Sequence, residues 1–125
     1  MDMDQVKALF TLFSGEEDTT TYQPVIYAAM TEVRQMLREG ASETDARLGY
    51  LAAAIANLRY TEIFGAREKA LATYAGTIAR QSDAAQQLRF AKQLVYSYQG
   101  LCKSLVVGTG FQFQVIPECY YASVN

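Results

Sequence analysis

Three acidic side chains, Glu43, Asp45 and Glu62, are of a type that supports general acid–base catalysis. Glu43 and Asp45 fall in the first turn of a helix that the sequence predicts from Ser42. Acidic residues are favoured at that position in any protein, because the positive end of the helix dipole stabilises them. We therefore interpret these carboxylates as structural, and we expect that the chain is not an enzyme.

The sequence contains no histidine and two cysteines, Cys102 and Cys119. Catalytic triads that use histidine and histidine-based metal sites are therefore excluded. The two cysteines do not form a Cys-x-x-Cys pair, so a zinc site is not expected either. The Gly108-Thr-Gly110 segment lacks a third glycine and follows an expected helix, which indicates a helix end and not a nucleotide-binding loop. We expect no metal and no cofactor.

The composition is that of one globular domain, with 125 residues of which 50% are hydrophobic and 19% are charged. The N-terminus is acidic and is followed by only a short apolar stretch, which does not resemble a signal peptide. The apolar runs are too interrupted to span a membrane. We expect a cytosolic, reduced protein without membrane association.

The charged residues are distributed unevenly along the chain. Residues 1–62 carry ten acidic and five basic residues, whereas residues 63–125 carry three acidic and six basic residues. Such a dipolar chain suits head-to-tail association, in which an acidic face of one copy meets a basic face of the next. The alternative interpretation is that both faces are simply solvated.

Apolar residues at three- and four-residue spacing predict four helices. The first extends from Asp2 or Asp4 to about Phe13, and the second from about Tyr22 to Gly40. The third begins at Ser42, ends near Gly65 and is apolar almost all round in residues 51–56, so it should be the most buried helix. The fourth begins at residues 82–83 and ends at residues 108–110. The expected buried positions are Val6, Leu9, Phe10, Phe13, Tyr22, Val25, Ile26, Ala29, Met30, Val33, Met36, Leu37, Leu48, Leu51, Ala52, Ile55, Leu58, Ile63, Ala84, Leu88, Ala91, Leu94, Val95, Tyr98, Leu101, Cys102 and Leu105.

Two segments do not fit the helical pattern. Residues 66–81 are interrupted at Gly76 and are interpreted as an extended arm between the third and fourth helices. Residues 111–115 alternate Phe, Gln, Phe, Gln and Val, which is typical of a half-buried strand. A single strand must find a partner for its backbone groups, either in the arm near residues 77–79 or in another chain. The predicted fold is thus all-α, a small bundle of about four helices with an extended arm and a lone C-terminal β-strand plus tail.

The arm and the C-terminal strand and tail are also the candidate interaction elements. Residues 1–110 would form the helical bundle, with the arm at about 66–81, and residues 111–125 would serve for docking. Exposed tyrosines in the tail would be natural interface anchors. The candidate interface residues are Arg67, Lys69, Tyr74, Ile78, Arg80, Phe111, Phe113, Val115, Tyr120 and Tyr121.

Basic residues between positions 67 and 92, interleaved with Tyr74 and Phe90, raise the possibility of a nucleic-acid-binding patch. The chain is acidic overall, and these basic residues are sparse and do not share one helix face. Sequence-specific DNA binding is therefore not the favoured interpretation. A weak contact with a phosphate backbone, independent of sequence, fits the pattern better.

The order of these elements resembles a known family. A short first helix is followed by an amphipathic helix with a Val-x-x-Ala-x-x-Glu-type face at residues 25–32, then by an Ala-rich helix with aromatics at residues 45–60. A linker containing glycine at residues 75–78, a final helix and a terminal Phe-x-Phe-x-Val complete the arrangement. Over residues 3–116, this layout resembles the small helical head–tail connector (adaptor) proteins of tailed bacteriophages and prophages.

The resemblance implies a structural role in the virion. Connectors of this family assemble as rings, usually of twelve copies, beneath the capsid portal, where they extend the channel for double-stranded DNA. The implied partners are other copies of the chain, the portal protein, the next neck or tail protein and the passing DNA, which is contacted without sequence specificity. The implied location is the virion neck, preceded by the host cytoplasm before assembly.

Two further function classes remain open from the sequence. The chain could be a small cytosolic helical interaction module, such as a regulator or chaperone, that forms a one-to-one complex with a partner protein. It could also be a nucleic-acid-binding regulator, whose affinity for free duplex DNA would fall steeply with salt.

Overall fold

The computed structural model describes residues 1–75 and 78–107 and, for residues 66–75 and 78–84, the course of the backbone only. This part of the chain forms four helices: α1 (Met3–Ser14), α2 (Gln23–Met36), α3 (Ala46–Ala75) and α4 (Ile78–Leu101). Within it, the only β-type pairing is an isolated bridge between Leu37 and Val106. The prediction of an all-α protein with four helices is confirmed.

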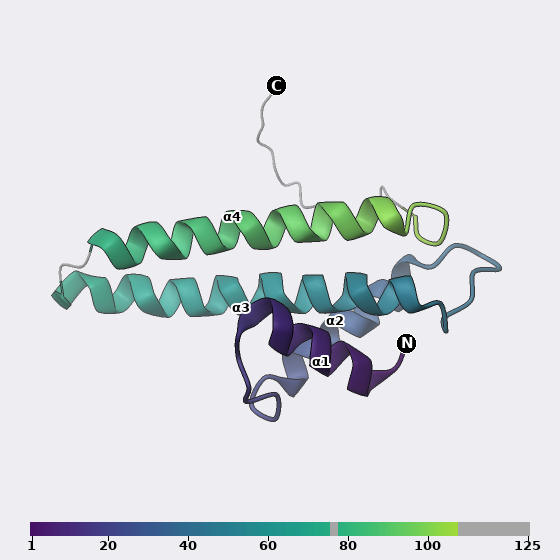
Figure 1. Ribbon diagram of the computed structural model, residues 1–125, viewed down its shortest axis with the longest axis horizontal. Coiled ribbons are helices and arrows are strands. Elements are labelled where there is room, and N and C mark those ends of the chain that lie inside the picture. Colours follow the sequence, from purple (N-terminus) through teal and green to yellow (C-terminus); the bar gives the residue numbers. More distant parts are fainter. Residues whose placement is uncertain (76–77, 108–125) are drawn as a thin grey trace, which may run out of the picture.

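The two long helices α3 and α4 lie side by side and run in opposite directions (Figure 1). The shorter helices α1 and α2 pack against the N-terminal half of α3, on the side away from α4 (Figure 1). Helix α3 is therefore the central element of the bundle. The far end of the α3–α4 pair extends beyond the region that α1 and α2 cover.

Helix α1 begins and ends close to where the sequence predicts. Asp2 is its N-cap, with a side-chain oxygen that accepts a hydrogen bond from the Asp4 backbone N–H, and Gly15 ends the helix in the left-handed conformation at φ 77°. Val6 and Phe10 are fully buried, as their spacing predicts, and Leu9 and Phe13 pack against the core from its margin.

Helix α2 begins near the predicted position, with Pro24 tolerated in its first turn. It ends at Met36, however, and not at Gly40. The reason is a long-range contact: the Met36 carbonyl accepts a hydrogen bond from the Val107 N–H at 2.7 Å, and the Arg38 N–H donates to the Leu105 carbonyl at 2.8 Å. Because Met36 and Arg38 bond to the chain that follows α4, the backbone turns extended at Leu37 and the helix ends there.

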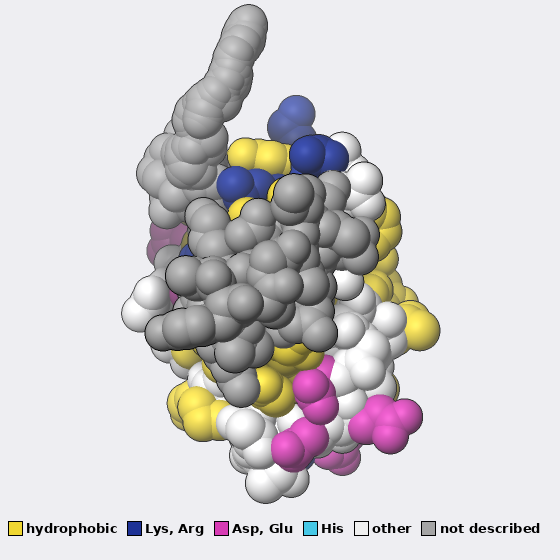
Figure 2. Space-filling model, turned by 90° about the vertical axis from the view of Figure 1, so that its left-hand side faces the viewer, with side chains coloured by type: hydrophobic (Ala, Val, Ile, Leu, Met, Phe, Trp, Pro, Cys, Tyr) yellow, Lys and Arg dark blue, Asp and Glu magenta, His cyan; other side chains and the backbone are white. Residues whose placement is uncertain are grey.

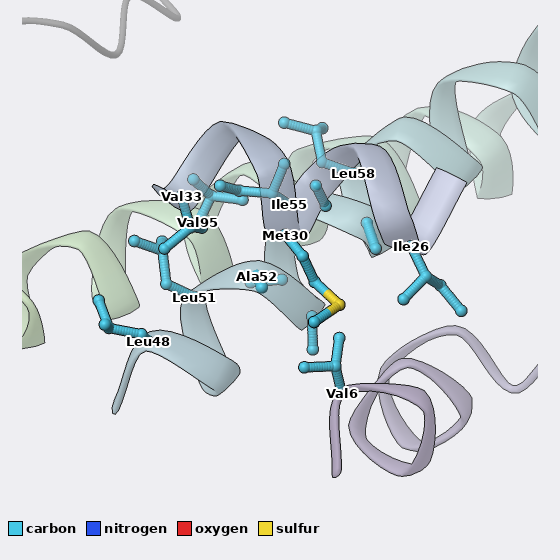
Figure 3. Packing of buried hydrophobic residues seen from close by; sticks show 14 of the residues in the cluster. Val6, Ile26, Met30, Val33, Leu48, Leu51, Ala52, Ile55, Leu58 and Val95 are labelled. Atoms are coloured by element: carbon cyan, nitrogen blue, oxygen red, sulfur yellow. The ribbon is translucent and has the colours of Figure 1, made fainter. Parts of the chain in front are cut away.

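The core surrounds α3 on all sides, as the run of apolar residues predicts. Every residue from Leu51 to Leu58 is buried, and side chains from the other three helices pack around them (Figure 3). Four of these residues are alanines, whose small side chains let neighbouring helices approach closely. The polar side chains of Asn57 and Thr61 are also buried, and the Thr61 hydroxyl donates to the Asn57 carbonyl one turn earlier at 2.7 Å.

The extended arm predicted at residues 66–81 is wrong. Helix α3 continues through Gly65 to Ala75, and α4 begins at Ile78 instead of at residues 82–83. Residues 66–72 are nearly all good helix formers, and one interior glycine costs only about 1 kcal/mol relative to alanine. A Cβ atom added at Gly65 would have no neighbour within 4 Å, so this glycine does not mark a close contact.

Three details at the margins of α3 and α4 also differ from the predictions. Ile63 and Leu101 were expected to be buried, but they are 43% and 48% exposed. Helix α4 ends at Leu101 and not at residues 108–110, because residues 102–105 form a turn that directs the chain back towards α2. Leu105, expected on a helical stripe, packs at the margin of the core from this turn.

The predicted strand at residues 111–115 and the tail that follows it lie outside the described residues. No helix in the described ranges has both the length and the apolar character that are needed to cross a membrane.

Candidate functional site

The structure describes five of the ten predicted interface residues, and for these five it describes the backbone only. The backbones of Arg67, Lys69 and Tyr74 belong to α3, and those of Ile78 and Arg80 belong to the start of α4. They lie near the end of the α3–α4 pair, where the side chains are not described. The other five candidates, Phe111, Phe113, Val115, Tyr120 and Tyr121, lie outside the described residues. The described side chains instead bring together two charged surfaces.

The first of these is an acidic loop between α1 and α2. Residues 14–22 contain Glu16, Glu17 and Asp18 and no basic residue. Ser14 fixes the start of the loop, because its hydroxyl donates to the Phe10 carbonyl at 2.7 Å and accepts from the Glu16 N–H at 3.0 Å. These hydrogen bonds stabilise the backbone conformation at the start of the loop, although the loop is exposed.

Asp18 closes the other end of the loop. Its carboxylate accepts hydrogen bonds from the Thr21 hydroxyl at 2.6 Å and from the Thr21 N–H at 3.1 Å. These hydrogen bonds lower the pKa of Asp18 below its usual value, because they stabilise the ionised form. The loop therefore keeps this negative charge into moderately acidic solution.

An aromatic cluster positions the acidic loop against α3. The Tyr60 ring is 5.5 Å from Phe10 and 4.9 Å from Tyr22, both in edge-on arrangements, and it stacks on Phe64 at 5.9 Å. The Tyr60 hydroxyl donates to a Glu16 carboxylate oxygen at 3.1 Å. Sequence reasoning missed this cluster, because its members are distributed over three separate segments and nothing in their spacing joins them.

The second surface is the outer face of α4. Over residues 85–101, where the side chains of α4 are described, Arg89 and Lys92 are the charged residues, and both are exposed. Phe90 is also exposed, at 59%, on the flank of the helix opposite Lys92. The inner face of the helix is formed by Ala91 and Val95, which are buried against α3. Helix α4 is thus basic and partly apolar on the side that faces solvent.

The two surfaces lie on opposite sides of the bundle. In Figure 2, dark blue basic side chains with yellow hydrophobic ones between them lie at the top, on the α4 side, and magenta acidic side chains lie at the bottom, on the side of the α1–α2 loop. Among the described side chains, the acidic residues of the α1–α2 loop are therefore separated in space from the basic residues of α4. This separation arises because α3 lies between the first two helices and α4.

The carboxylates considered for acid–base chemistry are each paired with an arginine. Glu43 accepts from Arg34 at 2.6 Å, Asp45 from Arg47 at 2.8 Å, and Glu62 lies 3.5 Å from Arg59. The hydrogen bond from Arg34 lowers the pKa of Glu43 below its usual value. In the described structure all three carboxylates are therefore partners in ion pairs.

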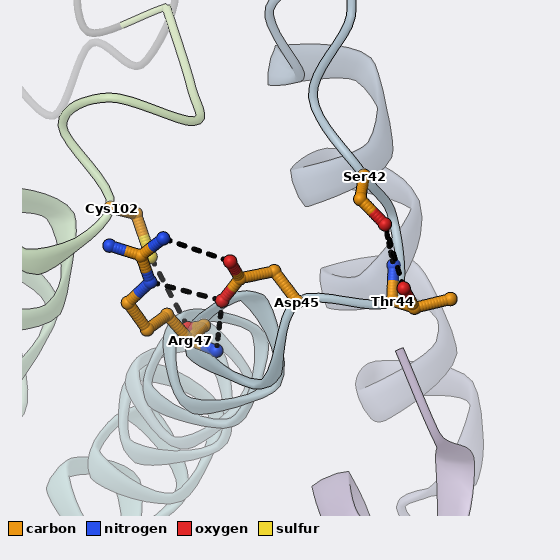
Figure 4. A network of polar contacts seen from close by, with 5 residues as sticks. All are labelled: Ser42, Thr44, Asp45, Arg47 and Cys102. Atoms are coloured by element: carbon orange, nitrogen blue, oxygen red, sulfur yellow. Dashed lines mark hydrogen bonds and ion pairs between the residues drawn. The ribbon is translucent and has the colours of Figure 1, made fainter.

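A polar network joins the start of α3 to the turn after α4 (Figure 4). Asp45 accepts hydrogen bonds from the backbone N–H and the guanidinium group of Arg47, and these bonds lower the pKa of Asp45 to about 2. Asp45 is therefore itself the cap of α3, which begins at Ala46 and not at Ser42. The Cys102 thiol donates to the Arg47 carbonyl at 3.2 Å.

Potential metal ligands do not cluster in the described part of the chain, where no group of three or more Cys, Asp or Glu side chains is arranged to hold an ion. Comparison of the chain with protein-family models, with curated proteins and with solved structures finds no match.

Proposed function

We propose that this chain is a non-enzymatic structural subunit of a phage neck, which forms a ring that joins the capsid portal to the tail and continues the DNA channel. The observation that supports the proposal is the position of the acidic α1–α2 loop and the basic face of α4 on opposite sides of one helical bundle. In a ring, every subunit presents two different surfaces, one to each neighbour. Opposite charges on these surfaces favour head-to-tail contact and disfavour contact between like surfaces.

The partners in this proposal follow from the same arrangement. Neighbouring copies meet through the charged surfaces, and the portal and the next neck protein meet two other elements of the chain. These elements are the end of the α3–α4 pair near residues 66–81 and the segment 111–125. The passing double-stranded DNA is contacted without sequence specificity. The protein is then located in the virion neck, after a period in the host cytoplasm before assembly.

Sedimentation of a tagged chain from a lysate of its native source, with electron microscopy of the heavy fraction, tests this function. The proposal expects the chain in DNA-containing particles, at a number of copies per particle that corresponds to one ring. A variant that lacks residues 111–125 is the matched comparison, and it should be depleted from these particles.

Recovery of the chain only as a light species with one discrete partner would overturn the proposal in favour of a small interaction module. Recovery on free duplex DNA, with an affinity that falls steeply as salt increases, would favour a nucleic-acid-binding regulator instead.

A further inference from the structure

We infer that the outer face of α4 in one copy of this chain docks onto the acidic loop of a second copy, so that the two sides of the contact are different surfaces. The inference rests on the proposed ring function, and it names the two surfaces through which neighbouring subunits meet. Each surface combines charged and exposed apolar side chains.

The basic surface consists of Arg89, Phe90, Lys92 and Leu101. Phe90 and Leu101 are 59% and 48% exposed, and they are eleven residues apart. At 1.5 Å and 100° per residue, that spacing places them on the same flank of α4, about 16 Å apart. Arg89 lies about 100° from Phe90 around the helix axis, in the middle of the outward face, and Lys92 lies on the opposite flank, about 160° from Phe90. An outward face that combines large apolar side chains with bases is typical of a protein-binding surface rather than of a purely solvated helix face.

The acidic surface consists of Leu12, Glu16, Glu17, Asp18 and Phe64. Leu12 lies in the last turn of α1, directly before the acidic loop, and is 75% exposed. Phe64 is joined to the loop through Tyr60, which stacks on Phe64 and donates a hydrogen bond to Glu16. This surface therefore also presents apolar groups beside its charges.

The internal hydrogen bonds of the loop favour binding. Ser14 and Asp18 fix the loop at its two ends in the free protein. A loop that is already ordered loses little conformational freedom when a partner binds, so more of the interaction free energy appears as affinity.

Charge complementarity identifies the occupant as a second copy. Contact between two α4 faces would place Arg89 and Lys92 against the same residues of the neighbour, and contact between two acidic loops would place three carboxylates against three. Both symmetric arrangements are repulsive, whereas contact between α4 and the acidic loop is attractive. Because the two surfaces lie on opposite sides of α3, each copy can bind two neighbours at once.

The test uses two variants of the full chain, each with one altered surface. The α4 variant is R89Q/K92Q, which removes the two charges without creating a partner for new lysines, and the loop variant is E17K/T20K. Glu17 and Thr20 are exposed, and their replacement leaves the Glu16–Tyr60 and Asp18–Thr21 hydrogen bonds in place. The matched control is A28E/Q35E, which adds two acidic residues at exposed positions of α2. Circular dichroism confirms that each variant is folded.

Masses are measured by sedimentation velocity and by light scattering at low salt. We expect that the wild type and the control form large assemblies, and that each surface variant alone is monomeric, with association weakened by roughly tenfold or more. A mixture of the two surface variants retains one intact contact per pair. It should therefore form a one-to-one dimer that grows no further. High salt should dissociate both the wild-type assembly and this dimer.

Each alternative outcome has a distinct meaning. If the surface variants assemble as the wild type does, the inferred contact is wrong while the ring function stands. If the mixture of the two monomeric variants does not dimerise, the contact is not between the α4 face and the loop. A wild-type chain that is monomeric at every concentration overturns the contact between copies, and the particle experiment then decides the proposed function separately.

Discussion

The thiol of Cys102 donates a hydrogen bond to the backbone carbonyl of Arg47 at 3.2 Å, although the two residues are 55 positions apart in the sequence. Cys102 lies in the turn that follows α4, and Arg47 lies in the first turn of α3. The hydrogen bond therefore links the turn after α4 to the first turn of α3. Two backbone hydrogen bonds between residues 36–38 and residues 105–107 close the same end of the bundle.

The first prediction concerns the reactivity of Cys102. Its side chain is fully buried, and burial raises the pKa of the thiol, so the reactive thiolate form is rarer than in an exposed cysteine. In a Cys119→Ser background, we expect iodoacetamide to label Cys102 in the native protein at least roughly tenfold more slowly than in the denatured protein. Mass spectrometry of timed samples measures the rate. Equal rates would show that the end of α4 opens readily in the native state.

The second prediction concerns Asp45 and pH. Its pKa is about 2 in the folded protein, against 3.8 for an unperturbed aspartate, so the folded state binds fewer protons than the unfolded state between these values. Stability from this carboxylate is complete above pH 3.8 and is lost as the pH falls through about 2. We expect Asp45→Asn to lower the melting temperature by several degrees at neutral pH, and the difference from wild type to shrink through this window.

Ser42→Ala is the control for Asp45→Asn. The Ser42 hydroxyl accepts a hydrogen bond from the Thr44 N–H at 3.2 Å in the same loop but carries no charge. Its removal should give a small loss of stability with no dependence on pH in the acidic range. An Asp45→Asn difference that is constant from neutral pH to pH 2 would contradict the assigned ionisation.

The third prediction compares two isoleucines on α3. Ile55 is fully buried between the surrounding helices, whereas Ile63 is 43% exposed. Ile55→Ala should lower the free energy of unfolding by about 2–5 kcal/mol, because it removes buried contacts and leaves a cavity. Ile63→Ala makes the same chemical change in the same helix and should cost less than about 1 kcal/mol. Urea denaturation monitored by circular dichroism measures both values, and equal losses would contradict the described packing of α3.

The fourth prediction concerns deletion of residues 111–125. The described core and the hydrogen bonds between residues 36–38 and 105–107 are formed by residues 1–107. A chain that ends at residue 110 should therefore keep the helical circular dichroism spectrum and the melting temperature of the full chain. The proposed function expects that this variant no longer enters DNA-containing particles, because the segment 111–125 is assigned to contact with the portal or the next neck protein. Loss of the helical fold itself would show that the deleted segment belongs to the core.

Local patterns in the sequence were sufficient for much of the bundle. The positions Val6, Phe10, Ile55 and Val95 were predicted to be buried from helical spacing, and all four are buried. The capping of α1 by Asp2 and its end at Gly15 also follow from residues that are adjacent in sequence. These features depend on neighbours within one or two turns, so the sequence carries their signal directly.

The predictions that failed were those in which a local sequence signal was outweighed by the surrounding helix-forming residues or by contacts with a distant segment. The sequence pattern predicts that the third helix ends near Gly65 and that Gly76 lies in an extended arm. In the structure, α3 extends to Ala75 and α4 begins at Ile78. A single glycine in a long run of helix-forming residues weakens a helix without ending it. The end of α2 at Met36 could not be predicted, because it depends on backbone bonds to residues almost seventy positions later.

The candidate functional surfaces also depend partly on the sequence alone and partly on tertiary contacts. The sequence by itself determined that the first half of the chain is acidic and the second half basic, because charge is a property of the residues alone. Only the tertiary structure decided that the acidic loop and the basic residues of α4 lie on opposite sides of α3, and that the Tyr60 hydroxyl of α3 donates a hydrogen bond to Glu16. The physical reason is that a helix specifies its own buried face through its periodicity. Which partners cover that face, and where the remaining charges lie, depends on contacts between residues far apart in the chain.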